Sequence, residues 1–194
     1  RYLTLEDRVT LPQLNMMWRT DRAYGPDDAA LSALGAILTD GKNSRLYNRL
    51  VYREQVAQSV SAFNDSQLLS GDFYIRVMGK EGTELDDLER TVLEEVQRLA
   101  ETGPTGEELQ RVKNSVETQV VSGLETVAAR ADGLNSYFYY TGDPDHVAEQ
   151  LEAYRALTAS DVQQAAARYL SDRNRVVISI VPAGSAELAA TEEG

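Results

Sequence analysis

Residues 41–63 read GKNSRLYNRLVYREQVAQSVSAF, and within this stretch the apolar spacing changes from that of a helix to that of a strand. Leu46 and Leu50 lie one helical turn apart, so we expect a helix near the start of the stretch. Apolar and small polar residues then alternate over 55–64, which is the period of a half-buried strand. Residues 72–79 repeat this alternation. The two alternating runs therefore predict a β-hairpin that follows a helix.

The sequence on either side of this stretch predicts one sheet with several helices. Residues 9–19 alternate like a strand, and residues 175–182 are β-branched and apolar on both faces, which indicates a central strand. Thr105 and Glu108 form a capping box, and the apolar pattern of the helix that it starts runs on past Gly123. Further helices are expected after Asp27, Thr83, Asp143 and Thr158. We therefore predict an α+β fold, with a mostly antiparallel sheet and helices packed on one of its faces.

The same patterns divide the chain into three parts. Residues 1–8 are interpreted as a linker from a preceding region, and residues 9–182 as a single domain. Residues 183–194 are small and acidic, so we expect a frayed tail. Because the first residues, which begin with Arg1 rather than Met, resemble a continuing linker, we expect an excised piece of a longer protein.

Composition disfavours two classes of partner. The chain has 31 acidic and 19 basic side chains and a net charge of −12, whereas a nucleic-acid-binding surface needs an excess of cations. Its apolar runs are far shorter than the roughly 20 residues of a membrane-spanning helix. We therefore expect no nucleic-acid partner and no membrane span.

The inventory of reactive side chains excludes several catalytic sites from this chain. There is no Cys, and His146 is the only histidine, so a two-histidine zinc motif and thiol catalysis are both absent. His146 itself is interpreted as a solvated residue at a helix start. No Gly-x-Ser-x-Gly motif and no phosphate-binding glycine loop occurs. We assign no catalytic and no metal-ligating residue, and no cofactor, to this chain.

Several short motifs follow one another along residues 9–182. They are Leu38-Thr39-Asp40-Gly41, Ser44-Arg45-Leu46-Tyr47, Ser59-Val60-Ser61-Ala62, Gly71-Asp72-Phe73, Gly103-Pro104-Thr105, Gly142-Asp143-Pro144, Leu157-Thr158 and Val181-Pro182. As an ordered set they resemble the pitrilysin/insulinase family of zinc metallopeptidases, which includes the mitochondrial processing peptidases. The likeness is to the non-catalytic, C-terminal-type "inactive" domain of that family. It implies the metallohydrolase-like architecture of LuxS and the processing peptidases.

The resemblance also implies partners. In this family zinc and the catalytic Glu belong to an HxxEH motif in another domain or subunit, and two halves enclose an unfolded peptide. The partner half often carries an Arg and a Tyr seven residues apart, but the matching positions here are Val51 and Gln58. The resemblance therefore implies that this domain lacks that pair and follows the zinc domain within the same half.

Within the motif set, Ser44, Arg45, Leu46 and Leu50 have two interpretations. In the first they support the fold: Ser44 caps a helix, the leucines fill the core, and the stem of Arg45 covers surface. In the second they contact the peptide directly. The aromatic run 137–140 has the same two interpretations, as helix packing or as chamber lining.

We expect a non-catalytic domain of a zinc endopeptidase that forms part of the peptide chamber and the inter-domain interface. The alternative is a structural or binding domain of the same fold in a non-peptidase assembly, such as a core subunit of a respiratory complex. An independent carboxylate-based catalyst is the third reading, and no spaced acid/base pair favours it. The sequence is compatible with both the bacterial periplasm and the cytoplasm.

Overall fold

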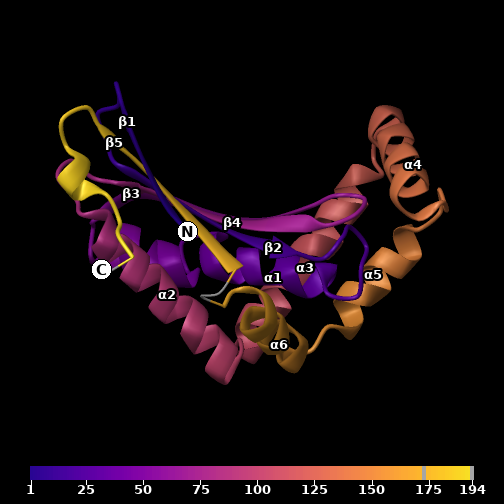
Figure 1. The fold of residues 1–194 in the computed structure, drawn as a ribbon. Coiled ribbons are helices and arrows are strands. Elements are labelled where there is room, and N and C mark those ends of the chain that lie inside the picture. Colours follow the sequence, from indigo (N-terminus) through magenta and orange to yellow (C-terminus); the bar gives the residue numbers. More distant parts are fainter. Residues whose placement is uncertain (172–173, 193–194) are drawn as a thin grey trace.

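The computed structural model describes residues 1–171 and 174–192 of the 194-residue chain. Its centre is a five-stranded sheet (Figure 1), formed by Tyr2–Asp7 (β1), Gln13–Thr20 (β2), Ala57–Ser66 (β3), Gly71–Gly79 (β4) and Arg175–Pro182 (β5). The strand order is β1-β5-β2-β4-β3. β1 and β5 pair in parallel, and the other neighbours pair antiparallel. The predicted hairpin, the mostly antiparallel sheet and the inner position of β5 are confirmed.

Helices cover one face of this sheet. The helices α1 (Asp28–Thr39), α2 (Leu85–Thr102) and α6 (Ala159–Tyr169) lie beneath it in Figure 1. Successive side chains of a strand point to opposite faces, so Leu14, Met16 and Trp18 of β2 face the helices and are fully buried. The apolar stripe of α2 meets them from below. The predicted packing of helices on one face is confirmed.

Three further helices form an arm at one end of the sheet. They are α3 (Gly106–Gly123), α4 (Val127–Thr141) and α5 (Val147–Ala156). The expectation that α3 continues past Gly123 is wrong, because the chain turns there and Thr126 starts a new helix by accepting a hydrogen bond from the Ala129 amide. α4 has no buried residue and stands clear of the sheet in Figure 1.

The expected helix in the 41–63 stretch is a π-helix, η1 (Tyr47–Arg53). Its wider turn is visible in the hydrogen bond from the Glu54 amide to the Arg49 carbonyl, which spans five residues. Gln55, with φ of 55°, then reverses the chain into β3. Leu50 stays fully buried inside η1, as its spacing predicted.

Residues 1–8, expected to be a linker, contribute the strand β1 to the sheet. Tyr2 to Asp7 pair with Val177 to Pro182 of β5. A polar clasp holds the strand: the Tyr2 hydroxyl donates to Glu89 at 2.8 Å and accepts from Arg175 at 2.8 Å. Leu3 and Leu5 alternate with Thr4 and Glu6, which is the period of a strand, but the run is short and its partner β5 lies far away in the chain.

The C-terminal segment, expected to be frayed, is ordered as far as it is described. Ala186–Leu188 form a short 3₁₀ helix (η3), and Ala189 and Ala190 are buried. The Ala190 amide donates to Ser179 of β5 at 3.0 Å. The small side chains of Ala189 and Ala190 therefore pack against the sheet. Residues 193–194 of the predicted tail lie outside the described residues.

Candidate functional site

Three of the four motif residues singled out from the sequence belong to the interior. Leu46 and Leu50 are fully buried in the core. Ser44 is also fully buried, and its hydroxyl donates to the Gly41 carbonyl at 2.6 Å while its own carbonyl accepts from the Asn48 amide. The Ser44 side chain therefore fixes the turn before η1.

The fourth motif residue, Arg45, joins two of the motifs. Its guanidinium donates to both oxygens of Glu108 at 2.8 Å and also to the Gly103 carbonyl at 3.2 Å. Glu108 accepts from the Thr105 amide at 2.8 Å and so completes the capping box of α3. Burial raises the pKa of the Glu108 carboxyl, but the hydrogen bonds from Arg45 and Thr105 outweigh it and leave that pKa below its ordinary value. The stem of Arg45 was expected to cover surface. Its side chain is instead only 14% exposed and is held in place by the ion pair with Glu108.

A polar hollow of about 1050 Å³ lies beside this pair. Arg49 lines it and forms ion pairs with Glu54, Glu94 and Glu95 at 2.7 to 3.2 Å. Arg98 also pairs with Glu95, at 3.4 Å. These ion pairs make the hollow a salt-bridge network that joins η1 to α2.

The two positions matched to the family's Arg and Tyr do not form a site together. Val51 packs against the core from η1, whereas Gln58 is exposed on β3 at a β-bulge, where it has no partner in the β4 register. Neither side chain can supply the cation or the phenol of that pair.

His146 lies among aromatic rings rather than in a cluster of metal ligands. Its imidazole meets the Tyr24 ring edge-on at 5.2 Å and lies 6.1 Å from the Tyr137 ring. The contacts join α5 to α4 and to the loop after β2. Within residues 1–171 and 174–192, no group of three His, Cys, Asp or Glu side chains is placed to hold a metal ion. The donor set of the described chain therefore does not fit zinc, and we assign no hydrolytic step to it.

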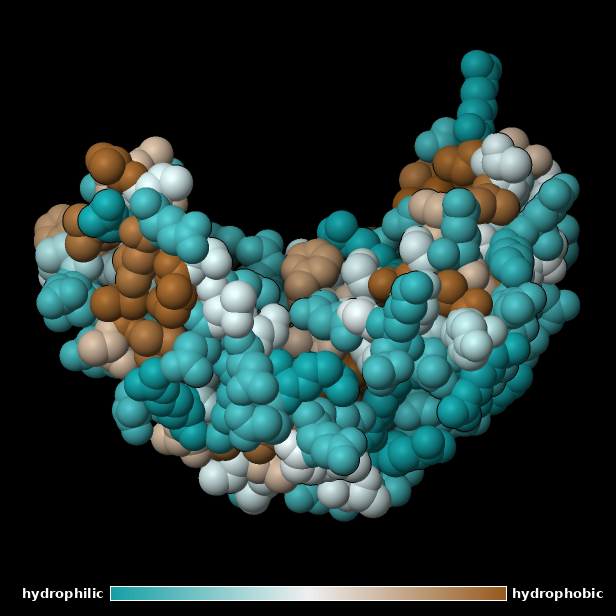
Figure 2. All heavy atoms as spheres, turned by 180° about the vertical axis from the view of Figure 1, so that it is seen from behind, coloured by the Kyte–Doolittle hydropathy of each residue, from teal (hydrophilic) through white to brown (hydrophobic). Residues whose placement is uncertain are grey.

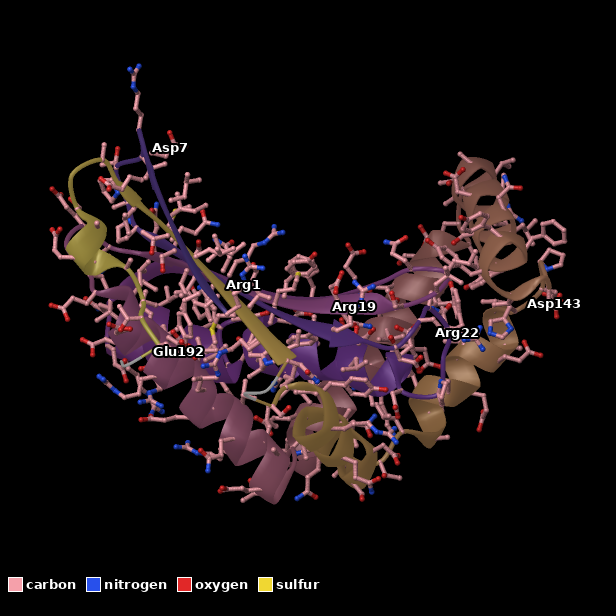
Figure 3. All side chains as sticks on the ribbon, in the orientation of Figure 1. Arg1, Asp7, Arg19, Arg22, Asp143 and Glu192 are labelled. Carbon is pink, nitrogen blue, oxygen red and sulfur yellow. The ribbon has the colours of Figure 1, made fainter. Side chains whose placement is uncertain are left out.

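The open face of the sheet is the other candidate surface. Figure 2 shows the molecule as a crescent that is hollowed between its two ends, and in Figure 3 the hollow lies between Asp7 at the tip of β1 and Asp143 after α4. Strand register sets the side chains of this face in rows across β5, β2, β4 and β3. The rows are Val176, Met17, Tyr74 and Phe63; Ile178, Asn15, Arg76 and Ser61; and Ile180, Gln13, Met78 and Ser59.

This face combines apolar and polar side chains. Leu3 and Leu5 of β1 continue the rows at one edge and are 44% and 52% exposed. The amides of Gln13 and Asn15 lie in the middle, and an Arg76–aromatic cluster lies toward β3. We call these side chains the open face. Of the motif residues of the sequence analysis, Ser59 and Ser61 belong to the open face, and the alternation within β2, β3 and β4 was the available signal.

Comparisons with known proteins identify the fold and the family. The model of the peptidase M16 inactive domain matches residues 1–116. A curated relative, the zinc protease PqqE of Helicobacter pylori, is 22% identical over 177 residues, which are 91% of this chain and 40% of that protein. This chain thus spans well under half of that relative.

Solved structures share the architecture. A protease from Helicobacter pylori superposes with a TM-score of 0.86 at 21% identity, over 94% of this chain and 44% of that one. The inactive peptidase domain of a Bordetella parapertussis protein gives 0.81 at 25% identity, over 92% and 94% of the two chains. A chain of complex III2 from Candida albicans gives 0.80 at 17% identity, over 93% and 45%.

No described helix has the length and apolarity needed to cross a bilayer. The described residues also lack the donors of a zinc site, and their fold is similar to the inactive peptidase domain from Bordetella parapertussis. A family model for the domain that has this fold without catalysis matches more than half of the residues. The chain belongs to the peptidase M16 inactive domain family.

Proposed function

We propose that this domain is a non-catalytic part of a zinc-dependent endopeptidase, in which it forms one wall of the chamber that encloses the peptide. The observation that carries the proposal is the open face, a hollowed sheet surface that no described helix covers. Its apolar rows and central amides suit an extended peptide of mixed sequence, because apolar side chains find contacts and main-chain groups find hydrogen-bond partners.

The catalytic apparatus belongs, in this proposal, to a companion domain or subunit that bears HxxEH. The zinc protease of Helicobacter pylori supports this division, because this chain matches only 40% of its length. When bound in the companion, zinc supplies activated water for hydrolysis. The residues of this chain bind and orient the peptide and shield it from bulk water.

α4 is proposed as part of the contact with that companion. Val127, Ala131, Leu134 and Phe138 recur at spacings of four, three and four residues, which places them on one side of the helix. Val127 is 77% exposed, Leu134 50% and Phe138 63%. An apolar stripe of this length is uncommon on a free surface and is typical of a docking face.

Site-specific crosslinking tests the chamber wall. Since the chain has no Cys, Ser61→Cys places a single thiol of this domain on the open face, and Ser160→Cys places a matched exposed thiol on α6. Each variant is mixed with the companion, whose catalytic Glu is replaced by Gln, and with an extended peptide that carries a bromoacetyl group. We expect Ser61→Cys to be labelled much faster than Ser160→Cys, and an unmodified peptide to slow it. Equal rates at the two positions would contradict the chamber assignment.

Activity measurements test the non-catalytic assignment separately. We expect the 194-residue chain alone to be inert toward a fluorogenic peptide and to raise cleavage when the HxxEH-bearing companion is added. Cleavage by the chain alone, with stoichiometric zinc, is the result that contradicts the proposal.

A structural role in a non-peptidase assembly is the second candidate. The likeness to a chain of complex III2, with a TM-score of 0.80, shows that the fold also occurs in a respiratory complex. The two candidates differ in the companion: an intact HxxEH with a downstream Glu favours the peptidase, and degenerate ligands favour the scaffold.

A further inference from the structure

Three side chains on the open face form a compact cluster. Phe63 of β3 and Tyr74 of β4 are directly paired across the hairpin, and their rings stack with centroids 5.3 Å apart and planes 25° from parallel. The guanidinium carbon of Arg76 lies 5.1 Å from the Phe63 ring centroid and 5.3 Å from that of Tyr74. Both distances are within the range of cation–π attraction.

The Arg76 guanidinium is bound by rings rather than by an acid. Among the residues that the structure describes, no carboxylate lies within the 4.0 Å of an ion pair with it, and the side chain is exposed. The nearest acidic position along its own strand on this face is Asp72, four residues away, or about 13 Å along the strand. Asp72 pairs with Arg19 at 3.3 Å, and Asp65 opposite it accepts from Gln67 at 2.9 Å.

This arrangement prepares Arg76 for a planar anion. A guanidinium resting on two rings has lost much of its rotational freedom, while the N–H groups at its edge remain available as donors. A carboxylate matches that edge with two parallel hydrogen bonds. Asn15 and Ser61, which flank Arg76 in its row, place an amide and a hydroxyl on either side. The ring pair offers apolar contact to the neighbouring part of the ligand.

We propose that Phe63, Tyr74 and Arg76 form a carboxylate-binding subsite for the peptide on the open face. The inference rests on the proposed function and names one chemical feature of the substrate. The chain carries a net charge of −12, so an acidic peptide is repelled by the domain as a whole. A cation without an acidic partner on the open face offsets that repulsion locally. Either an Asp or Glu side chain or a C-terminal carboxylate supplies the anion.

Peptide titrations of the 194-residue chain, followed by amide chemical shifts, test the subsite. A relative's inactive domain of nearly the same length has been solved as a separate chain, so the domain is a suitable sample. Three extended peptides are compared: one with Gln and an amidated end, one with Glu and an amidated end, and one with Gln and a free C-terminus. We expect shifts over the open face with all three, and about fivefold tighter binding for one carboxylate-bearing peptide than for the neutral one. The peptide that gains affinity identifies the source of the anion.

Variants assign the difference to the cluster. Arg76→Gln should abolish the preference for the carboxylate but leave neutral-peptide binding unchanged, and Arg76→Lys should keep only part of it, because the planar fork is lost. Arg53→Gln removes an exposed arginine from η1, off the open face, and is the matched control, for which we expect no change. Amide spectra of each variant show whether it is folded.

The outcomes separate the two levels of the proposal. If all three peptides bind the open face equally, or if Arg76→Gln retains the preference, the carboxylate subsite is wrong while the chamber wall stands. If no peptide shifts the open-face amides, the chamber wall is overturned together with the subsite.

Discussion

α2 and α4 carry the same kind of apolar stripe, yet one lies in the core and the other faces outward. The stripe of α2 is Leu85, Leu88, Val92, Val96 and Leu99, none of which is more than 3% exposed. The stripe of α4 has similar spacing, but Val127 is 77% exposed and Phe138 63%. α2 lies against the sheet, whereas α4 continues the arm beyond it (Figure 1).

The difference shows that helical periodicity predicts an apolar contact without specifying the partner. For α2 the partner is this domain's own sheet, so its stripe contributes to folding. We call the sheet and the helices beneath it the body of the domain. The body contacts a different side of α4, where Tyr137 and Tyr140 of the helix meet Tyr24. The outer stripe is left for a second domain, which is the role proposed above.

Matched leucine truncations should give the largest effect. Leu88→Ala leaves a cavity in the core, and we expect it to lower the free energy of unfolding by about 3 kcal/mol. Leu134→Ala removes the same atoms from a half-exposed position on α4 and should change the free energy of unfolding by less than about 0.5 kcal/mol. Urea unfolding of both variants measures the difference. Similar losses would show that α4 packs into the core in solution.

Glu108→Gln should weaken the joint between the body and the arm. Loss of the charge leaves the buried Arg45 without its counter-ion, and we expect a cost of about 2 kcal/mol at pH 7. The folded-state pKa of Glu108 is lowered, so its contribution is present above the unfolded pKa of about 4.3 and is lost as the pH falls through the folded value.

The pH dependence of unfolding provides the check on that prediction. Between pH 5 and pH 3 the parent chain should lose stability more steeply than Glu108→Gln, so the two curves converge in acid. Parallel curves would mean that Glu108 has an unshifted pKa and that its loss acts through packing alone.

Tyr2→Phe tests the clasp on β1, a region at the opposite end of the sheet from α4. The variant removes the hydroxyl between Glu89 and Arg175, and we expect a loss of about 1 kcal/mol. The Arg175–Glu89 ion pair at 2.9 Å remains, which limits the effect. Faster amide exchange confined to β1 and the facing part of β5 supports the clasp. Unchanged exchange in β1 would contradict it.

Removing helix caps should change global stability least, and should change local amide exchange most clearly. Thr126→Ala removes the cap of α4. Because α4 contributes no buried residue to the core, we expect faster amide exchange within α4 and almost no change in the unfolding midpoint. Thr158→Ala removes the equivalent cap of α6 in the body and should cost about 1 kcal/mol of global stability. Comparable midpoint shifts in the two variants would remove the distinction between arm and body.

Local patterns predicted most of the fold. Apolar spacing placed α2 and the β3–β4 hairpin, and a capping box placed α6, since these signals depend on neighbours within a few residues. Thr83, expected at the start of α2, makes no cap and instead donates to the Val56 carbonyl at 3.2 Å. Side chains with distant partners were harder to interpret. Asp27 precedes α1 as expected, but its carboxylate makes no cap and instead accepts from Arg168 and the Tyr169 hydroxyl at 2.8 and 2.7 Å.

The candidate site was less predictable than the fold. The sequence motifs led to Ser44 and Arg45, which hold η1 and α3 in place, whereas most residues of the open face, apart from Ser59 and Ser61, belong to no motif. Arg76 carried no signal in the sequence, because the subsite proposed for it depends on Phe63, which the hairpin register brings next to Tyr74. Strand alternation indicates which residues share a face, but it does not indicate which face the helices leave open.

The sequence alone predicted β2 to β5 and the helices that cover the sheet, together with the family likeness and the lack of a two-histidine zinc motif, but it did not predict β1. These follow from residue types and short spacings. The tertiary structure alone decided that β1 joins β5, that Arg45 meets Glu108 across 63 residues, and that the stripe of α4 stays exposed. The physical reason is that such contacts depend on the packing of segments far apart in the chain, and local propensity contains no information about that packing.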